Sequence, residues 1–370
     1  MLHDTLQAIL VRAVADSAFP GGIAVIGTHA GALATVAVGH LDWAPSPVPD
    51  ANTIWDLASL TKVVGMTSAM MQLVEQKRID LDAPVQRYLP TWTGRWKERV
   101  TVRDLLTHRS GLPAFRQYFK LNLSPDSTLA LQLNTPLDTM PGVRMVYSDI
   151  GAITAGKIVE RVSGEPLDQY LARHVFQPLG MRDTRYRPDA SLRARIAPTE
   201  IDPWRGRHLR GEVHDENAAA LGGVSAHAGL FSTSHDLARL AEAYLNGGAL
   251  GGARLARAET IRQFTTVQDT GLSQRALGWD TPPGAGSGHF LRRPAFGHTG
   301  FTGTSLWIAP QHDLYVILLT NRVNPTREHN RIPPVRTAIA DATVRLLFPA
   351  VVSTLEAHAA AASPPSSPRP

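Results

Sequence analysis

The sequence has no cysteine among its 370 residues. Disulfides, thiol catalysis and cysteine metal sites are therefore all excluded. No run of about eighteen apolar residues occurs either, so we expect no membrane span. The formal net charge is +5, but the arginines are scattered and form no basic stripe with interleaved aromatic residues, so we do not expect nucleic-acid binding.

The beginning of the chain lacks the pattern of a secretory signal. Residues 1–16 form an amphipathic stretch with an acid at Asp4, and no basic segment is followed by an apolar one. We therefore expect a cytoplasmic protein. A mature exported chain, with its signal removed and a start methionine added, would look the same.

The order of apolar patterns predicts two interlocked lobes. Helical spacing marks residues 2–17, and apolar runs that bracket a turn predict a hairpin of buried strands at 22–27 and 32–38. Between about 80 and 200 we expect short helices and no strand. The later segments predicted are strands at 296–303, 305–309 and 314–321 and a closing helix at 332–347. These patterns predict an α/β lobe from residues 1–75 and 225–350, an all-α lobe from 76–224, and a disordered Ala/Ser/Pro tail at 359–370.

Ser59 and Lys62 form the first candidate for chemistry. They stand three residues apart in a predicted helix, so the lysine amine can reach the serine hydroxyl, as an activated nucleophile requires. Asp56 is a suitable N-cap, which would place Ser59 in the first turn. Ser-x-x-Lys alone is weak evidence, because roughly one chain of this composition in four would contain it by chance.

Two later segments strengthen this candidate. Tyr147-Ser148-Asp149 stands just before an apolar helix at 150–162, and Gly297-His298-Thr299-Gly300 lies within a predicted strand. Each segment is unspecific alone. In this order, with gaps as long as a lobe, the three segments together favour one shared site in a cleft between the lobes.

These residues resemble those of a known family, the serine β-lactamase and penicillin-binding-protein-like hydrolases, particularly the class C and family VIII esterase branch. The matching elements are Ser-x-x-Lys, Tyr-x-Asn and Lys-Thr-Gly or His-Thr-Gly. The phrases L-L-T-H-R-S-G-L-P and G-H-T-G-F-T-G-T are also similar to this branch, and the resemblance covers residues from about 20 to 347. It implies a β-lactamase/transpeptidase-like fold, in which helices flank an antiparallel sheet and a helical lobe is inserted.

The resemblance also implies a mechanism without metal or cofactor. Ser59 would attack a carbonyl to form an acyl-enzyme, and Lys62 and Tyr147 would share the acid and base work. The backbone NH groups of Ser59 and Phe301 would form the oxyanion hole.

The substrate would be bound by four further residues, Asp149, His298, Thr299 and Gly300. Of these, His298 and Thr299 would contact the carboxylate or ester side of the substrate.

Two positions depart from the family pattern. Asp149 replaces the usual asparagine, and near Lys62 its charge would favour the ammonium form, which shifts the role of base toward Tyr147. His298 replaces the usual lysine, so a permanent cation becomes one present only at lower pH. Both changes favour esters or other amides over β-lactams.

Several other patterns receive less weight. Gly223-Val224-Ser225-Ala226-His227 resembles a Gly-x-Ser-x-Gly nucleophile elbow, but it ends in histidine and lacks a βαβ context. A cluster of potential metal ligands does not match a helical zinc spacing, so we expect hydrogen-bonded structural histidines. That cluster consists of His214, Asp215, Glu216, His227 and His235.

Two further patterns concern single residues. His108 is expected to compensate a helix dipole at the end of the helix V-R-D-L-L-T-H. Neither Glu160 nor Glu165 stands in the Glu-x-x-Leu-Asn phrase of a class A β-lactamase, so that branch is disfavoured.

The sequence thus predicts a serine hydrolase whose substrate is a small ester or amide. Carboxylic esters are the first choice, and β-lactams or D-alanyl-D-alanine peptides are the second. A catalytically silent protein that binds cell-wall peptides or a partner protein is the alternative from another class. The sequence leaves acyl preference and oligomeric state open.

Overall fold

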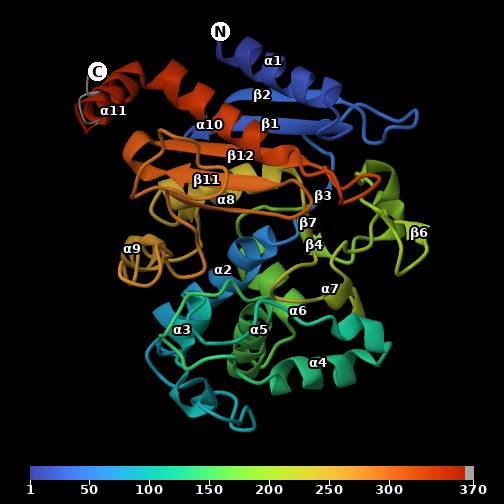
Figure 1. Ribbon diagram of the computed structural model, residues 1–370, viewed down its shortest axis with the longest axis vertical. Helices are drawn as coiled ribbons and strands as arrows, with labels where there is room; N and C mark the ends of the chain where they lie inside the picture. Colours follow the sequence, from blue (N-terminus) through green and yellow to red (C-terminus); the bar gives the residue numbers. More distant parts are fainter. Residues whose placement is uncertain (363–370) are drawn as a thin grey trace, which may run out of the picture.

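The structure is a computed structural model that describes residues 1–362, and Figure 1 shows a sheet with its covering helices above a lobe of short helices. The helices are α1 (Leu2–Ala15), α2 (Thr67–Glu75), α3 (Val102–Leu106), α4 (Pro125–Asn134), α5 (Asp149–Ser163), α6 (Leu167–Leu171), α7 (Glu216–Ala220), α8 (Ser234–Leu245), α9 (Ala258–Thr265), α10 (Ile332–Leu347) and α11 (Pro349–Ala362). The strands are β1 (Gly21–Thr28), β2 (Gly31–Gly39), β3 (Trp55–Asp56), β4 (Arg185–Tyr186), β5 (Ile201–Asp202), β6 (Arg207–His208), β7 (Leu230–Ser232), β8 (Ala249–Leu250), β9 (Ala253–Arg254), β10 (Phe296–Thr299), β11 (Ser305–Ala309) and β12 (Leu314–Thr320).

The main sheet joins the two ends of the chain. Its strand order is β10-β11-β12-β1-β2, and every neighbouring pair is antiparallel. The register places Ile23 opposite Leu319 on one side and opposite Ala37 on the other. The N-terminal hairpin, the C-terminal strands and the closing helix were all predicted, and the structure confirms them, except that β10 ends at Thr299, four residues before the predicted end at 303.

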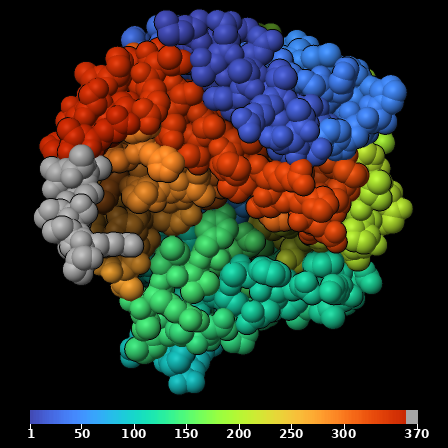
Figure 2. Space-filling view, turned by 45° about the horizontal axis from the view of Figure 1, so that its top comes forward, coloured from blue at the N-terminus to red at the C-terminus, as the bar shows by residue number. Residues whose placement is uncertain are grey.

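The central strand β1 is buried on both faces because helices cover both sides of the sheet. Ile23 and Val25 belong to the apolar core shared with α2 and α8, whereas Ala24 and Ile26 face α1 and α10. Figure 2 shows the blue N-terminal and red C-terminal segments side by side above the green helical lobe. Each fully buried Ile or Val side chain stabilises this arrangement by about 1.5–3 kcal/mol.

The helical lobe contains short strands that the sequence did not predict. β4, β5 and β6 all lie within residues 76–224, and β4 pairs with β7 in a small sheet that also contains β3. The expectation of an all-helical segment is wrong at these three places. A strand of two residues is too short to show the alternation by which strands are recognised.

The C-terminal tail also differs in part from expectation. Residues 359–362 continue α11, so disorder is the wrong prediction there, and 363–370 lie outside the described residues. Alanine has the highest helix propensity, which explains why the run from Ala359 to Ala362 extends an existing helix. Within residues 1–362, no single helix is both long and apolar enough to cross a membrane; α10 and the first part of α11 reach that length and composition only together, across a bend of 110°.

Candidate active site

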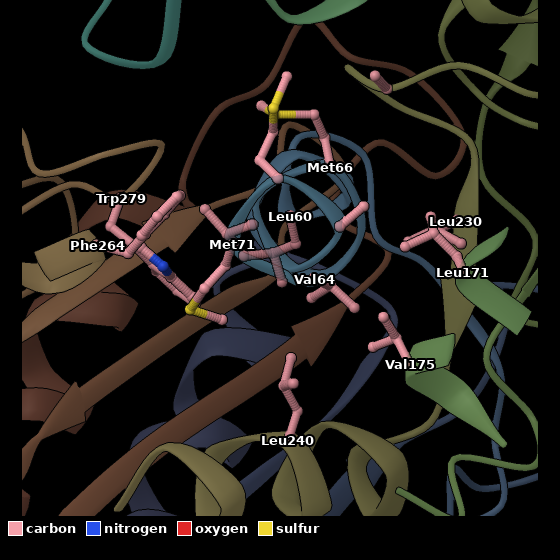
Figure 3. Packing of buried hydrophobic residues seen from close by; sticks show 14 of the residues in the cluster. Leu60, Val64, Met66, Met71, Leu171, Val175, Leu230, Leu240, Phe264 and Trp279 are labelled. Carbon is pink, nitrogen blue, oxygen red and sulfur yellow. The ribbon is translucent and has the colours of Figure 1, made fainter. Parts of the chain in front are cut away.

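Ser59 lies on the turn between β3 and the helix predicted to carry it. The helix begins with a π-helical segment, Lys62–Met66, and continues as α2. Figure 3 shows how this helix is held, with Leu60, Val64 and Met71 packed among apolar side chains of the surrounding elements. π-Helical segments often occur at functional sites.

Asp56 does not cap this helix, so that prediction is wrong. One carboxylate oxygen accepts a hydrogen bond from the Ala58 amide at 2.8 Å, and the other accepts one from the His214 amide at 2.6 Å. Asp56 is already the last residue of β3, and Ala58 follows with a φ of 46°. The carboxylate therefore fixes the turn that presents Ser59, including a conformation that is costly for alanine.

Lys62 lies at the centre of the site, with a side chain only 1% exposed. Its Nζ donates to Ser59 Oγ at 2.9 Å and to the His227 carbonyl at 3.0 Å, and it pairs with Asp149 Oδ1 at 2.7 Å. Two hydrogen bonds and one ion pair therefore hold the amine in place. Burial alone would lower the pKa of Lys62, but the charge of Asp149, followed by Tyr147, raises it above its ordinary value.

The Tyr147-Ser148-Asp149 segment is held firmly at the start of α5. The Ser148 hydroxyl accepts a hydrogen bond from the Gly151 amide at 3.0 Å and donates one to the Pro113 carbonyl at 2.6 Å. The Ser148 amide donates to His108 Nδ1 at 3.0 Å. This N-cap fixes where the side chains of Tyr147 and Asp149 begin.

His108 does not compensate a helix dipole, contrary to expectation. It is buried, and its Nδ1 acts as an acceptor, as in a neutral ring. Burial, followed by the charges of Arg275 and Lys62, places the pKa of His108 well below its usual range. The residue supports the Tyr147 segment instead.

The Tyr147 ring lies between two histidines and near two cations. Its centroid is 4.5 Å from that of His108 and 5.8 Å from that of His298. Lys62 Nζ lies 4.9 Å from the same centroid, and the Arg275 guanidinium lies 5.1 Å from it. The phenol oxygen is buried, and within the described part of the chain it has no hydrogen-bond partner.

His298 ends the site as a neutral side chain. Nδ1 lies 2.8 Å from the Thr299 carbonyl, which can only accept, so Nδ1 carries the proton. Nε2 is then an acceptor; it is buried and has no partner among the described residues. Burial, then Arg275 and Lys62, hold the pKa of His298 well below its usual range, so the cation expected at lower pH is suppressed further.

Thr299, Gly300 and Phe301 follow where β10 ends. A Cβ on Gly300 would lie 2.1 Å from Thr304 Oγ1 and 2.3 Å from the Leu57 carbonyl, so only glycine fits. The Arg322 Nε donates to the Phe301 carbonyl at 2.7 Å. Among residues 1–362, neither the Ser59 nor the Phe301 amide donates to a main-chain acceptor, so both remain available for a developing oxyanion.

Two cavities meet at Ser59 and Phe301. The first, of about 330 Å³, we name the arginine cavity, and the second, of about 300 Å³, the carboxylate cavity. The arginine cavity is lined by Ser59, Tyr147, Arg275, Asp280, Ala285, His298, Thr299, Gly300, Phe301, Arg322, Asn330, Ile332 and Arg336. The carboxylate cavity is lined by Ala58, Ser59, Phe115, Gln117, Phe119, Asp149, His214, Asp215, Glu216, Asn217, Ala228, Phe301 and Arg327.

The structure thus brings all of the predicted site residues to these two cavities or to their edge. It adds Arg275, Arg322 and Arg336, which the sequence analysis missed. No motif marks these arginines, and only the fold brings them to one cavity. Burial lowers the pKa of Arg322 and of Arg336 to about 10, so both remain cationic at neutral pH.

The alternatives considered from sequence lie elsewhere or serve structure. His214 and His227 are hydrogen-bonded to Glu200 and Asp215, as expected of structural histidines. Among the residues that the structure describes, no group of three or more histidines or carboxylates could hold a metal ion. Glu160 lines neither cavity.

Comparisons with known proteins agree with this geometry. A family model described as Beta-lactamase matches residues 6–341. A relative from Salmonella schwarzengrund, named putative D-alanyl-D-alanine carboxypeptidase, is 33% identical over 316 residues, which cover 76% of this chain and 72% of the relative.

Solved structures show the same fold at lower identity. A penicillin-binding protein homologue from Caulobacter crescentus matches with a TM-score of 0.75 at 21% identity, covering 92% of this chain and 96% of that one. A family VIII carboxylesterase matches with a TM-score of 0.73 at 22% identity, covering 93% and 97%. The chain therefore belongs to the beta-lactamase family, with a β-lactamase/transpeptidase-like fold and the activity class of a serine hydrolase.

Proposed function

We propose that Ser59 is the nucleophile, that Tyr147 is the base and that Lys62 acts as an ammonium ion. The observation that carries this assignment is the position of Lys62 Nζ, 2.9 Å from Ser59 Oγ and 2.7 Å from Asp149 Oδ1. A lysine paired with a carboxylate is a poor base, because the carboxylate favours the protonated amine. The nearby ammonium instead stabilises the charge on a Tyr147 phenolate.

The reaction then proceeds in two balanced steps. Ser59 Oγ attacks the substrate carbonyl while its proton passes to Tyr147, and the carbonyl oxygen takes up negative charge facing the amides of Ser59 and Phe301. Tyr147 gives the proton to the leaving group, and the acyl group remains on Ser59. Water activated by Tyr147 hydrolyses this ester and restores the enzyme.

The position of Tyr147 also supports a proposal for which part of the substrate each cavity holds. Tyr147 protonates the leaving group and lines the arginine cavity but not the carboxylate cavity. The leaving group therefore enters the arginine cavity, and the acyl group enters the carboxylate cavity. Arg275 offers a free donor there, because its Nη1 is buried without a partner in the described part of the chain.

We therefore propose that the preferred substrates carry a carboxylate on the leaving group, as a peptide ending in a free D-amino acid does. The name of the Salmonella relative supports a carboxypeptidase. Esters, the first choice from sequence, become the second candidate. The neutral His298 supports esters, because the motif position then offers no cation to a substrate carboxylate.

A matched pair of substrates tests the proposal. An acyl D-lactate ester and its D-lactamide share the acyl group and the reacting bond, and only the lactate carries a carboxylate. We expect kcat/KM to be about 10- to 100-fold higher for the lactate, the size of a charge-assisted hydrogen bond of about 1.5–3 kcal/mol. Equal values for the two would contradict the carboxylate preference, and p-nitrophenyl butyrate and a chromogenic cephalosporin would then rank esters against β-lactams.

A further inference from the structure

A chain of three hydrogen-bonded side chains stands directly behind the proposed catalytic residues. Ser225 Oγ lies 2.7 Å from His227 Nδ1, and His227 Nε2 lies 2.9 Å from Asp215 Oδ1. The His227 side chain is only 1% exposed, and Ser225 is 5% exposed. Ser225 and His227 stand in the phrase G-G-V-S-A-H-A-G-L-F, which also resembles the family, but the mechanism above gives this chain no role.

The direction of the hydrogen bonds follows from Asp215. Burial alone would raise the pKa of Asp215, but His227, the Ala218 amide and Lys62 together hold it below its usual range. The carboxylate therefore accepts the Nε2 proton of His227. When the ring carries only that proton, Nδ1 accepts the hydroxyl proton of Ser225.

His227 is connected to the catalytic site through its main chain. Its carbonyl accepts a hydrogen bond from Lys62 Nζ at 3.0 Å, one of the three contacts that fix that amine. Within the described structure, no amide of residues 225–229 donates to another main-chain group, so main-chain hydrogen bonds from these amides do not hold the segment. Side-chain contacts hold the segment instead: the Tyr186 hydroxyl donates to the Ser225 carbonyl at 2.9 Å, and the His227 side chain is bound at both ring nitrogens.

We propose that His227 is a positioning residue and that Ser225 and Asp215 lock its ring, so that the His227 carbonyl holds Lys62 against Ser59. This inference rests on the role proposed above for Lys62. The order of the three side chains is that of a nucleophilic Ser-His-Asp triad, but the ring nitrogens are exchanged, because in the triad Nε2 faces the serine and Nδ1 faces the aspartate. Ser225, however, borders a separate cavity of about 240 Å³, which contains neither Tyr147 nor Phe301. Its hydroxyl therefore serves His227 and does not attack substrate.

The test uses Ser225→Ala, Ser225→Thr and a control, Ser234→Ala. Ser234 is also buried, its hydroxyl has no partner among the described residues, and it lies in α8 away from the cavities. We expect Ser225→Ala to lower kcat about 10-fold, the cost of a lost buried hydrogen bond, with KM nearly unchanged. Ser225→Thr retains the hydroxyl and should restore most of the rate, whereas Ser234→Ala should behave as wild type.

Asp215→Asn provides a second route should Ser225→Ala fold poorly. It removes the charge that fixes the His227 tautomer and should also lower kcat about 10-fold, with thermal midpoints measured on every variant. If Ser225→Ala and Asp215→Asn both retain wild-type kcat, the positioning role is overturned.

A fluorophosphonate label separates failure of this inference from failure of the proposed function. If wild type is labelled only at Ser59 while the variants remain fully active, only the positioning role fails. An adduct on Ser225 in a Ser59→Ala background would overturn both assignments.

Discussion

The arginine cavity and the carboxylate cavity share Ser59 and Phe301 but differ in charge. Three arginines and one aspartate line the first, and three carboxylates and one arginine line the second. Phe301 lines both cavities. Arg322 lies 4.2 Å from the centroid of the Phe301 ring, and the His214 ring centroid lies 5.7 Å from it.

This difference indicates how a substrate is oriented. In the proposed mechanism, a scissile bond at Ser59 would have one end in a positive cavity and the other in a negative one, and an anionic leaving group would be attracted to the first and repelled by the second. Under this proposal, charge would select the direction of binding as well as the substrate. A neutral ester lacks this preference and can bind in either direction.

The largest effect is expected from Ser59→Ala, which leaves both cavities intact but removes the nucleophile they share. We predict a loss of kcat of about 10⁴-fold or more and no fluorophosphonate adduct, since the remaining residues cannot form an acyl-enzyme. Mass spectrometry of the labelled protein checks this. Residual turnover within 10-fold of wild type would show that the reaction occurs elsewhere.

Arg275→Gln removes one positive charge from the lining of the arginine cavity. Its side chain is 12% exposed and lies 3.6 Å from Asp280, so the substitution removes a charge from a cavity wall with little change in volume. We predict that the ratio of kcat/KM for the D-lactate ester to that for its D-lactamide falls about 10- to 100-fold. An unchanged ratio would mean that another group recognises the carboxylate.

Asp149→Asn removes a negative charge beside Lys62, at the edge of the carboxylate cavity. Asp149 raises the pKa of Lys62 and favours the ammonium, so the neutral asparagine should lower the pH at which Lys62 loses its proton. If the ammonium is the active form, the alkaline limb of the pH-rate profile moves to lower pH. A shift of the acid limb would instead show that neutral Lys62 is the base, and two unmoved limbs would remove Lys62 from the rate-limiting step.

Phe301→Ala removes a ring that lines both cavities and should have the smallest effect. The backbone amide remains, so we predict a reduction of kcat/KM of only about 3- to 10-fold for small substrates, with relatively better turnover of bulky acyl groups. A series of acyl chain lengths measures this. If long and short chains lose activity equally, the ring does not limit the size of the acyl group.

Local patterns predicted the main elements because those elements carry strong signals. The apolar runs of β1 and β12 can be read without tertiary information, and the capping box that Thr101 and Asp104 form at the start of α3 has a signature in the sequence as well. The two-residue strand β4 could not be predicted, because its pairing with β7 depends on a partner far along the chain.

The residues of the candidate site also differ in whether local sequence could reveal them. Ser59, Lys62, Tyr147 and His298 stand in motifs and could be named in advance. The neutral state of His298 and the neutral, hydrogen-bonded role of His108 could not, because both depend on burial beside Arg275 and Lys62. Asp215 and His227 were considered as metal ligands, because sequence gives no indication of which partner a buried histidine finds.

The pairing of β1 with β12 has a consequence for synthesis. A nascent chain that has passed Lys62 and Tyr147 still lacks the strand beside β1 and the whole of β10 to β12, which arrive only with residues 296–320. Until these strands are made, the β1 edge of the N-terminal hairpin stays unpaired. Unpaired strand edges tend to associate with other chains. Hydrolytic activity should therefore emerge only after residues 296–320 have been synthesised.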